Sequence, residues 1–112
     1  MNKIHRLKDN RDFSRVFQQG KSVANRYLVL YHAPNQLEHY RVGISVSKKI
    51  GIAVVRNKVK RYVREAFRTS GIDSFLSVDF VIIARQPAVD LDFTDFCCHL
   101  AHLLHKAGYI RK

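Results

Sequence analysis

Apolar residues recur at helical spacing in three stretches of the chain. In the first stretch, Phe13, Val16 and Phe17 occupy positions i, i+3 and i+4, which places them on one face of a helix that Gly20 would end. The last stretch repeats this spacing with bulky apolar residues and stops at Gly108. The predicted helices cover about residues 9–19, 53–69 and 94–106.

Four other stretches have the alternation or the apolar composition of β-strands. In one of them, Tyr27, Val29 and Tyr31 point to one side and the residues between them to the other. Only a short polar turn separates this segment from the next, so the two are predicted to pair as an antiparallel hairpin. The last segment is apolar enough for a central strand, with Asp79 interpreted as a strand-edge residue. The predicted strands cover about residues 21–24, 27–33, 40–46 and 78–84.

The segments follow one another in the order α-β-β-β-α-β-α, without an internal repeat, a linker or a low-complexity tract. A chain of 112 residues suits one compact domain, and its 46% apolar content is enough for a core without disulfides. We therefore predict a single domain over residues 1–112 with an α+β fold. It would be a two-layer α/β sandwich, in which helices cover one face of a small mixed sheet of about four strands.

Features that would place the chain outside the cytoplasm are missing from the sequence. Cys97 and Cys98 are adjacent in a predicted helix, where they cannot form a disulfide without distorting the backbone, and they lack metal-ligand spacing. No apolar run approaches the roughly 20 residues that span a bilayer. The first residues lack the apolar segment of a signal peptide. We therefore predict a protein of the reducing cytoplasm.

Charge is high and unevenly distributed. The formal net charge is +11 and the pI is near 10.1. Residues 1–68 hold 16 of the 20 lysines and arginines and four acids, a local net charge of +12, whereas residues 69–112 carry −1. Such a balance is typical of proteins that bind nucleic acid or an anionic membrane surface. The first two thirds of the chain, including a basic arm at residues 1–8 that we expect to be loosely ordered, would build that surface.

The second predicted helix concentrates these cations on one side. Val59, Val63 and Phe67 mark its apolar face, and Glu65 is its only acid. A solvated face would normally mix both signs, whereas a polyanion would relieve the repulsion among like charges. The polar face comprises Arg56, Asn57, Lys60, Arg61, Arg64 and Arg68.

Side-chain catalysis is poorly supported by the sequence. The acids Asp90, Asp92 and Asp95 sit at the start of the last helix, where they suit the positive end of the helix dipole. The histidines of that helix drift around its axis and do not converge on one point as zinc ligands would. No phosphate-binding glycine loop is present.

Aromatic residues near the N-terminus alternate with cations. Phe13, Phe17, Tyr27 and Tyr31 could stack on the bases of a single strand while neighbouring cations neutralise its backbone, at about 1–3 kcal/mol per stacked base. The spacing of Phe13 and Phe17 is equally compatible with packing of the first helix onto the sheet.

Residues 41–61, RVGISVSKKIGIAVVRNKVKR, closely resemble the bacterial ribonuclease P protein subunit. The resemblance extends to Arg6-Leu7-Lys8, to Asp12-Phe13, Val16-Phe17 and Gly20-Lys21-Ser22, and to the apolar strand and the closing helix. It thus covers nearly the whole chain, and the run from Ala53 to Arg61 is its most specific part.

The resemblance implies a left-handed β-α-β crossover, an exception to the usual handedness. It also implies that the protein joins a catalytic RNA, and that the holoenzyme hydrolyses one phosphodiester of precursor tRNA to release the 5′ leader. The RNA, with bound Mg²⁺, would perform the chemistry, and the protein would improve substrate and metal binding. The protein would hold no metal stably by itself and would be monomeric when free.

Roles for individual residues are also implied by the resemblance. The RNA-subunit contacts would be Arg56, Asn57, Lys60, Arg61, Arg64 and Arg68, and the leader contacts Phe13, Phe17, Val29 and Tyr31. Supporting cations would be Lys8, Arg11, Arg15, Lys48 and Lys49. Lys58 stands where the family commonly has arginine; it keeps the charge, loses the planar fork, and falls off the main basic face.

Three other functions remain open from the residues alone. A structural RNA chaperone of the ribosomal type would explain the charge but leave the aromatic residues unused. A self-sufficient protein nuclease would need clustered acids that the chain lacks. Membrane binding through the basic helix would compete with the use of its apolar face in the core.

Overall fold

The computed structural model describes residues 5–111. Their elements follow the predicted order, and the boundaries differ from the predicted ones by at most one residue. The helices are α1 (Asn10–Gln19), α2 (Ala53–Thr69) and α3 (Phe93–Lys106), and the short 3₁₀ helices are η2 (Lys48–Ile50) and η3 (Gln86–Asp90). The strands are β1 (Lys21–Ala24), β2 (Leu28–Pro34), β3 (Arg41–Ser45) and β4 (Val78–Ala84).

The four strands form one mixed sheet in the order β1-β2-β4-β3. The predicted hairpin between the second and third strands is wrong, because β4 lies between them, antiparallel to β2 and parallel to β3. Phe80, Val81 and Ile82 are fully buried on both faces of β4, which explains why this strand takes a central place. The local hairpin is instead β1–β2, whose turn is fixed by Asn25 Oδ1 accepting from two backbone amides.

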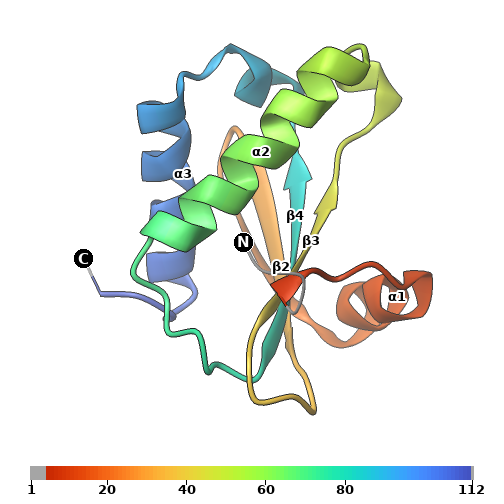
Figure 1. The fold of residues 1–112 in the computed structure, drawn as a ribbon, viewed down its shortest axis with the longest axis vertical. Coiled ribbons are helices and arrows are strands. Elements are labelled where there is room, and N and C mark those ends of the chain that lie inside the picture. Colours follow the sequence, from red (N-terminus) through yellow and green to blue (C-terminus); the bar gives the residue numbers. More distant parts are fainter. Residues whose placement is uncertain (1–4, 112) are drawn as a thin grey trace.

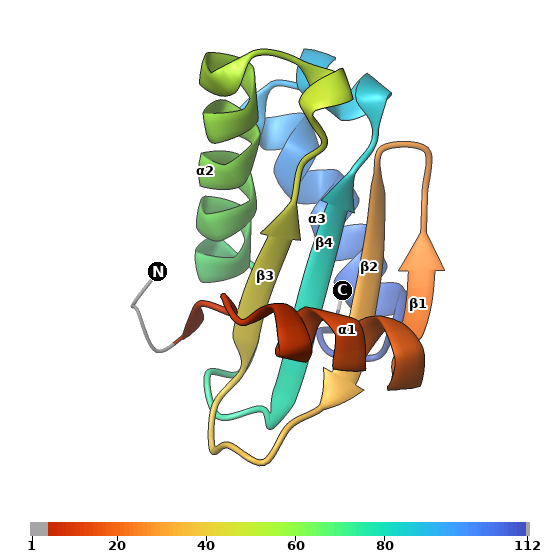
Figure 2. The same cartoon turned by 90° about the vertical axis from the view of Figure 1, so that its right-hand side faces the viewer.

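Helices cover both faces of the sheet, not one as predicted. α2 and α3 pack on the face that carries Leu30, Phe80 and Ile82, and α1 crosses the opposite face (Figures 1 and 2). There Val16 of α1 packs against Val81 in a second, smaller apolar cluster. The strands therefore bury side chains on both sides, and the prediction holds only for α2 and α3.

The connection from β3 through α2 to β4 is left-handed. In Figure 2 both strands run upward, with β4 to the right of β3 and α1 in front of the sheet. α2 packs on the face opposite to α1, so the chain passes behind the sheet to reach β4. This is the exceptional handedness that the family resemblance implies.

Asp79 is a fully buried carboxylate and not the strand-edge residue that we predicted. Arg41 donates to it from Nε at 2.9 Å and from Nη2 at 2.7 Å, Asn35 donates from Nδ2 at 2.9 Å, and Arg15 of α1 also donates to it. Burial opposes ionisation, but the hydrogen bonds from Arg41 and Asn35 outweigh it and lower the pKa of Asp79. This network joins α1, β3 and β4.

Candidate nucleic-acid interface

α2 divides into two faces as the sequence predicts. Val59, Val63, Ala66 and Phe67 are buried against the sheet and α3. The polar set lies outside this contact. Arg56, Lys60 and Arg64 are half-buried, and Asn57, Arg61 and Arg68 are exposed.

Most cations of this face have no acidic partner among residues 5–111. Among residues 5–111, no carboxylate lies within 4.0 Å of the charged nitrogens of Arg56, Lys60, Arg61 or Arg64. Arg68 differs, because it donates to Glu65 Oε2 from Nη2 at 2.7 Å and from Nε at 3.0 Å. These hydrogen bonds lower the pKa of Glu65. Four of the five cations thus remain available to an external anion.

Lys58 turns away from the basic face, as the sequence predicts. Its Nζ lies 3.5 Å from the carbonyl oxygen of Val89 and 5.4 Å from the ring centroid of Tyr62. The side chain therefore faces η3 and lies apart from the six-residue polar set.

The N-terminal arm is docked where the structure describes it. Residues 5–8 lie beside β3: Arg6 forms a parallel bridge with Val42, and the amide of Leu7 donates to the carbonyl of Val42 at 3.0 Å. Leu7 is buried, and His5 Nδ1 lies 2.8 Å from the carbonyl oxygen of Tyr40. The expectation of a loosely ordered arm is wrong for residues 5–8, and its first four residues lie outside the described part of the chain.

The predicted leader contacts Phe13, Phe17, Val29 and Tyr31 come from α1 and β2. We use the name aromatic groove for these four residues. Phe17 and Tyr31 meet edge to face with ring centroids 5.0 Å apart, and Phe13 lies 6.4 Å from Phe17. Phe17 is 39% exposed, whereas Phe13 is half-buried against the apolar cluster beneath α1. Phe13 therefore packs the helix onto the sheet and also borders the groove.

The predicted supporting cations differ in their surroundings. The Arg11 side chain is 96% exposed, and Lys8, Lys48 and Lys49 are also exposed. Arg15 is committed to the fold, because its guanidinium donates to the carbonyl of Pro34 at 2.8 Å and to Asp79. It braces α1 against the sheet and has little capacity left for a ligand.

Neither a metal centre nor a membrane span emerges from the described residues. Within residues 5–111, no three His, Cys, Asp or Glu side chains are grouped so that they could hold a metal ion. In the same part of the chain, no helix has the length and apolar character needed to cross a bilayer.

The sequence matches the family model for Ribonuclease P over residues 1–108. The chain belongs to the ribonuclease P protein family. The "Ribonuclease P protein component" of Geobacillus sp. (strain WCH70) is 44% identical over 114 residues, covering 100% of this chain and 97% of the relative. That of Macrococcus caseolyticus (strain JCSC5402) is 45% identical over 113 residues, with the same coverage.

Solved structures of this family share the fold. The RNase P protein of Staphylococcus aureus superposes with a TM-score of 0.86 at 45% identity, covering 96% of this chain and 98% of that one. The RNase P protein of Thermotoga maritima superposes with a TM-score of 0.81 at 37% identity, with the same coverage. The family membership and the α+β fold class inferred from the sequence are thereby confirmed.

Two residues near the interface were missed by sequence reasoning. Arg6 falls in the arm that the sequence predicts to be loosely ordered, although its alternation with buried Leu7 and exposed Lys8 is the period of a strand-like segment. Gly43 was given no role, and no local pattern marks it, because the residue that approaches it belongs to α1.

Proposed function

We propose that this protein is the RNA-binding subunit of ribonuclease P, and that it helps the holoenzyme remove the 5′ leader from precursor tRNA. The observation that carries the proposal is the polar face of α2. Arg56, Lys60, Arg61 and Arg64 lie there without carboxylate partners among residues 5–111, in a chain that belongs to this family. Such a face would neutralise several phosphates of a folded RNA and release their counterions.

The aromatic groove is the proposed site for the leader. Phe17 and Tyr31 present partly exposed rings, and Val29 lies two residues before Tyr31 on the same side of β2. Unpaired bases stack on such rings without regard to sequence, as a variable leader requires. The exposed cation Arg11 on α1 could neutralise the backbone of the same strand.

The protein's own contribution would be binding and orientation. Mg²⁺ held with the RNA would supply the hydrolytic chemistry when bound. The described residues offer no donor cluster for it, so we assign no catalytic residue to this chain. We further propose that the free protein is a monomer of the cytoplasm.

A reconstituted cleavage assay tests this function. Precursor tRNA is incubated with the catalytic RNA at a magnesium concentration too low for the RNA alone, with and without the protein. We expect the protein to restore cleavage, and Lys106→Ala, which removes an exposed cation on α3, to restore it equally. Failure of the unmodified protein to restore cleavage would refute the proposal.

A structural RNA chaperone is the competing function, and a binding comparison separates the two. A leader groove gives the complex a preference for precursor over mature tRNA, whereas a chaperone gives none. Cleavage of precursor tRNA by the protein alone would instead indicate a protein nuclease.

A further inference from the structure

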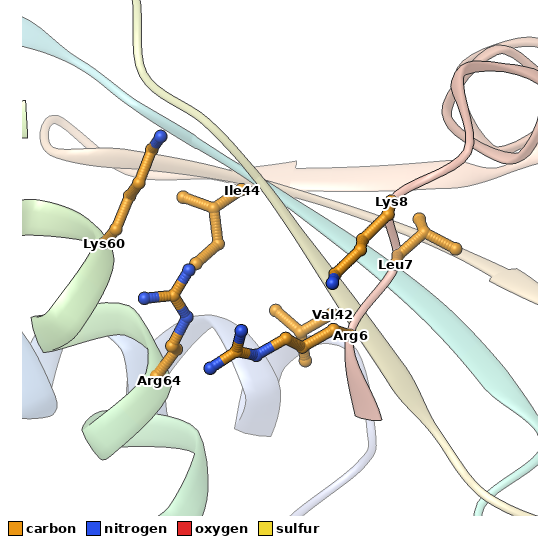
Figure 3. A pocket seen from close by; sticks show the side chains of 7 residues that line it. All are labelled: Arg6, Leu7, Lys8, Val42, Ile44, Lys60 and Arg64. Carbon is orange, nitrogen blue, oxygen red and sulfur yellow. The ribbon is translucent and has the colours of Figure 1, made fainter. Parts of the chain in front are cut away.

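A small cationic pocket lies between the arm, β3 and α2 (Figure 3). It has a volume of about 120 Å³ and is open to solvent. Apolar side chains of Leu7, Val42 and Ile44 form part of its lining. The remaining lining residues are all cations: Arg6 and Lys8 from the arm, and Lys60 and Arg64 from successive turns of α2.

The charge of this cationic pocket is uncompensated. No carboxylate of residues 5–111 lies within 4.0 Å of the charged nitrogens of the four cations. Arg6 Nε and Arg64 Nε are buried, and neither has a hydrogen-bond partner in the described part of the chain. A buried donor without an acceptor destabilises a fold. Burial, and then repulsion by the nearby charge of Arg6, lower the pKa of Arg64.

We propose that the cationic pocket binds one phosphate group of the RNA partner, held between the guanidinium groups of Arg6 and Arg64. In Figure 3 the Arg6 side chain extends from the arm toward α2 and ends beside the side chain of Arg64, and Lys8 reaches in from the same strand-like segment as Arg6. Planar guanidinium groups donate paired N–H groups to phosphate oxygens, and the two orphaned donors would gain acceptors. The inference rests on the proposed function, because the phosphate is assigned to the catalytic RNA.

A phosphate fits the cationic pocket better than a base does. Its lining contains no aromatic ring on which a base could stack. Because the cations come from two distant segments, one anion would join the arm to α2. The arm would then belong to the interface with the catalytic RNA, and its cations would not contribute to leader binding.

A double-mutant cycle on the assembled complex tests the shared phosphate. Arg6→Gln, Arg64→Gln and the double variant remove charge but retain most of each aliphatic stem. Dissociation constants for the catalytic RNA are measured across a salt series. Each single variant should weaken binding roughly tenfold and reduce the salt slope by about one. The double variant should be little weaker than either single one, since both remove the same contact.

Arg61 supplies the matched control. It is exposed on the same helix and does not line the cationic pocket, so the effects of Arg6→Gln and Arg61→Gln should multiply. If the effects of Arg6→Gln and Arg64→Gln also multiply, the proposal of a shared phosphate is wrong. That result is distinct from failure of the proposed function, in which the unmodified protein would not bind the catalytic RNA.

A titration with inorganic phosphate tests whether the cationic pocket binds a free anion or only a phosphate of the RNA. The free protein is titrated while the backbone amides of Leu7 and Ile44 are followed by NMR, with Arg64→Gln and Lys106→Ala as variants. Saturable shifts that Arg64→Gln abolishes and Lys106→Ala retains, together with coupling in the complex, support the proposal. If phosphate shifts these amides but the effects of Arg6→Gln and Arg64→Gln on RNA binding multiply, the cationic pocket binds free phosphate only. That result would overturn the proposal. If the effects of Arg6→Gln and Arg64→Gln on RNA binding are coupled but inorganic phosphate shifts neither amide, the cationic pocket is selective for the RNA backbone. That result also supports the proposal.

Discussion

The ring of Phe13 lies directly against the backbone of Gly43. A Cβ atom built on Gly43 would lie 2.5 Å from Phe13 Cζ and 2.8 Å from its Cε1. The same atom would lie 3.1 Å from Leu7 Cδ2, so α1, β3 and the arm converge at this glycine. Gly43 has no positive φ, so the demand for glycine comes from this close approach and not from backbone conformation.

Gly43→Ala should therefore displace Phe13 and disturb the aromatic groove. We expect a loss of roughly 1–3 kcal/mol in unfolding free energy, as for other overpacked sites, and a weaker preference of the complex for precursor tRNA. Denaturant unfolding and tRNA binding measure the two effects. Phe13→Leu in the Gly43→Ala background offers a smaller side chain and should recover part of the stability. An additive loss in the double variant would contradict this close-packing account.

Asp79 should govern the stability of α1 on the sheet. Asp79→Asn removes a buried charge from two arginines, and breaking such a network typically costs about 3–5 kcal/mol. Because the folded-state pKa of Asp79 is lowered, its ionisation stabilises the fold above the ordinary value of 3.8, and this contribution is lost as the pH falls through the folded-state pKa.

Urea unfolding between about pH 2 and pH 7 tests the assignment in the unmodified protein and in Asp79→Asn. The variant should lose stability at neutral pH and show a shallower decline on acidification. Asp73→Asn is the control, because Asp73 is exposed and hydrogen-bonds only a local backbone amide. Parallel pH curves for the unmodified protein and Asp79→Asn would show that another carboxylate controls the acid transition.

The cations of α2 should contribute unequally to assembly. Arg61→Ala or Arg64→Ala should weaken binding of the catalytic RNA by roughly tenfold and flatten its salt dependence by about one unit of slope. Arg68→Ala should have a smaller effect, because Glu65 already accepts two hydrogen bonds from its guanidinium group. Equilibrium binding over a salt series measures all three. Equal losses of RNA affinity for Arg61→Ala and Arg68→Ala would contradict the inference that pairing with Glu65 reduces the contribution of Arg68.

Local features were predicted well and non-local ones poorly. The bounds of α2 follow from its apolar period, and those of β4 follow from its β-rich composition. Both are local properties of the segment itself. The pairing of β2 with β4 depends on residues far apart in the sequence, and the short polar turn after β2 favoured a hairpin that does not form. The hydrogen-bond partners of buried Asp79 likewise come from three separate segments.

The candidate site shows the same division. The two faces of α2 follow from the helical spacing of its apolar and basic residues, so the sequence alone identifies its cations. The spacing of Phe13 and Phe17 left packing and binding equally open, and the structure shows Phe13 in the cluster beneath α1 and Phe17 more exposed. Arg6 could not be joined to Arg64, because only the docking of the arm on β3 brings them to one pocket.

Tyr31 should contribute to substrate binding and not to assembly with the catalytic RNA. Its ring lies 5.0 Å from that of Phe17, on the side of the sheet that α1 covers, whereas α2 packs on the opposite side. Tyr31→Ala should weaken binding of precursor tRNA to the holoenzyme by about tenfold, the loss expected for one stacked base. Binding of mature tRNA and of the catalytic RNA should stay unchanged, because neither engages the groove.

Phe75→Ala is the matched control for this variant. Phe75 is 79% exposed in the loop between α2 and β4 and lies outside the aromatic groove, so its removal takes away an aromatic ring without touching the proposed leader site. A series of precursors with leaders shortened one nucleotide at a time extends the comparison. The penalty of Tyr31→Ala should disappear once the leader is too short to reach the groove. A penalty that persists with mature tRNA would assign Tyr31 to the body of the substrate and contradict the leader assignment.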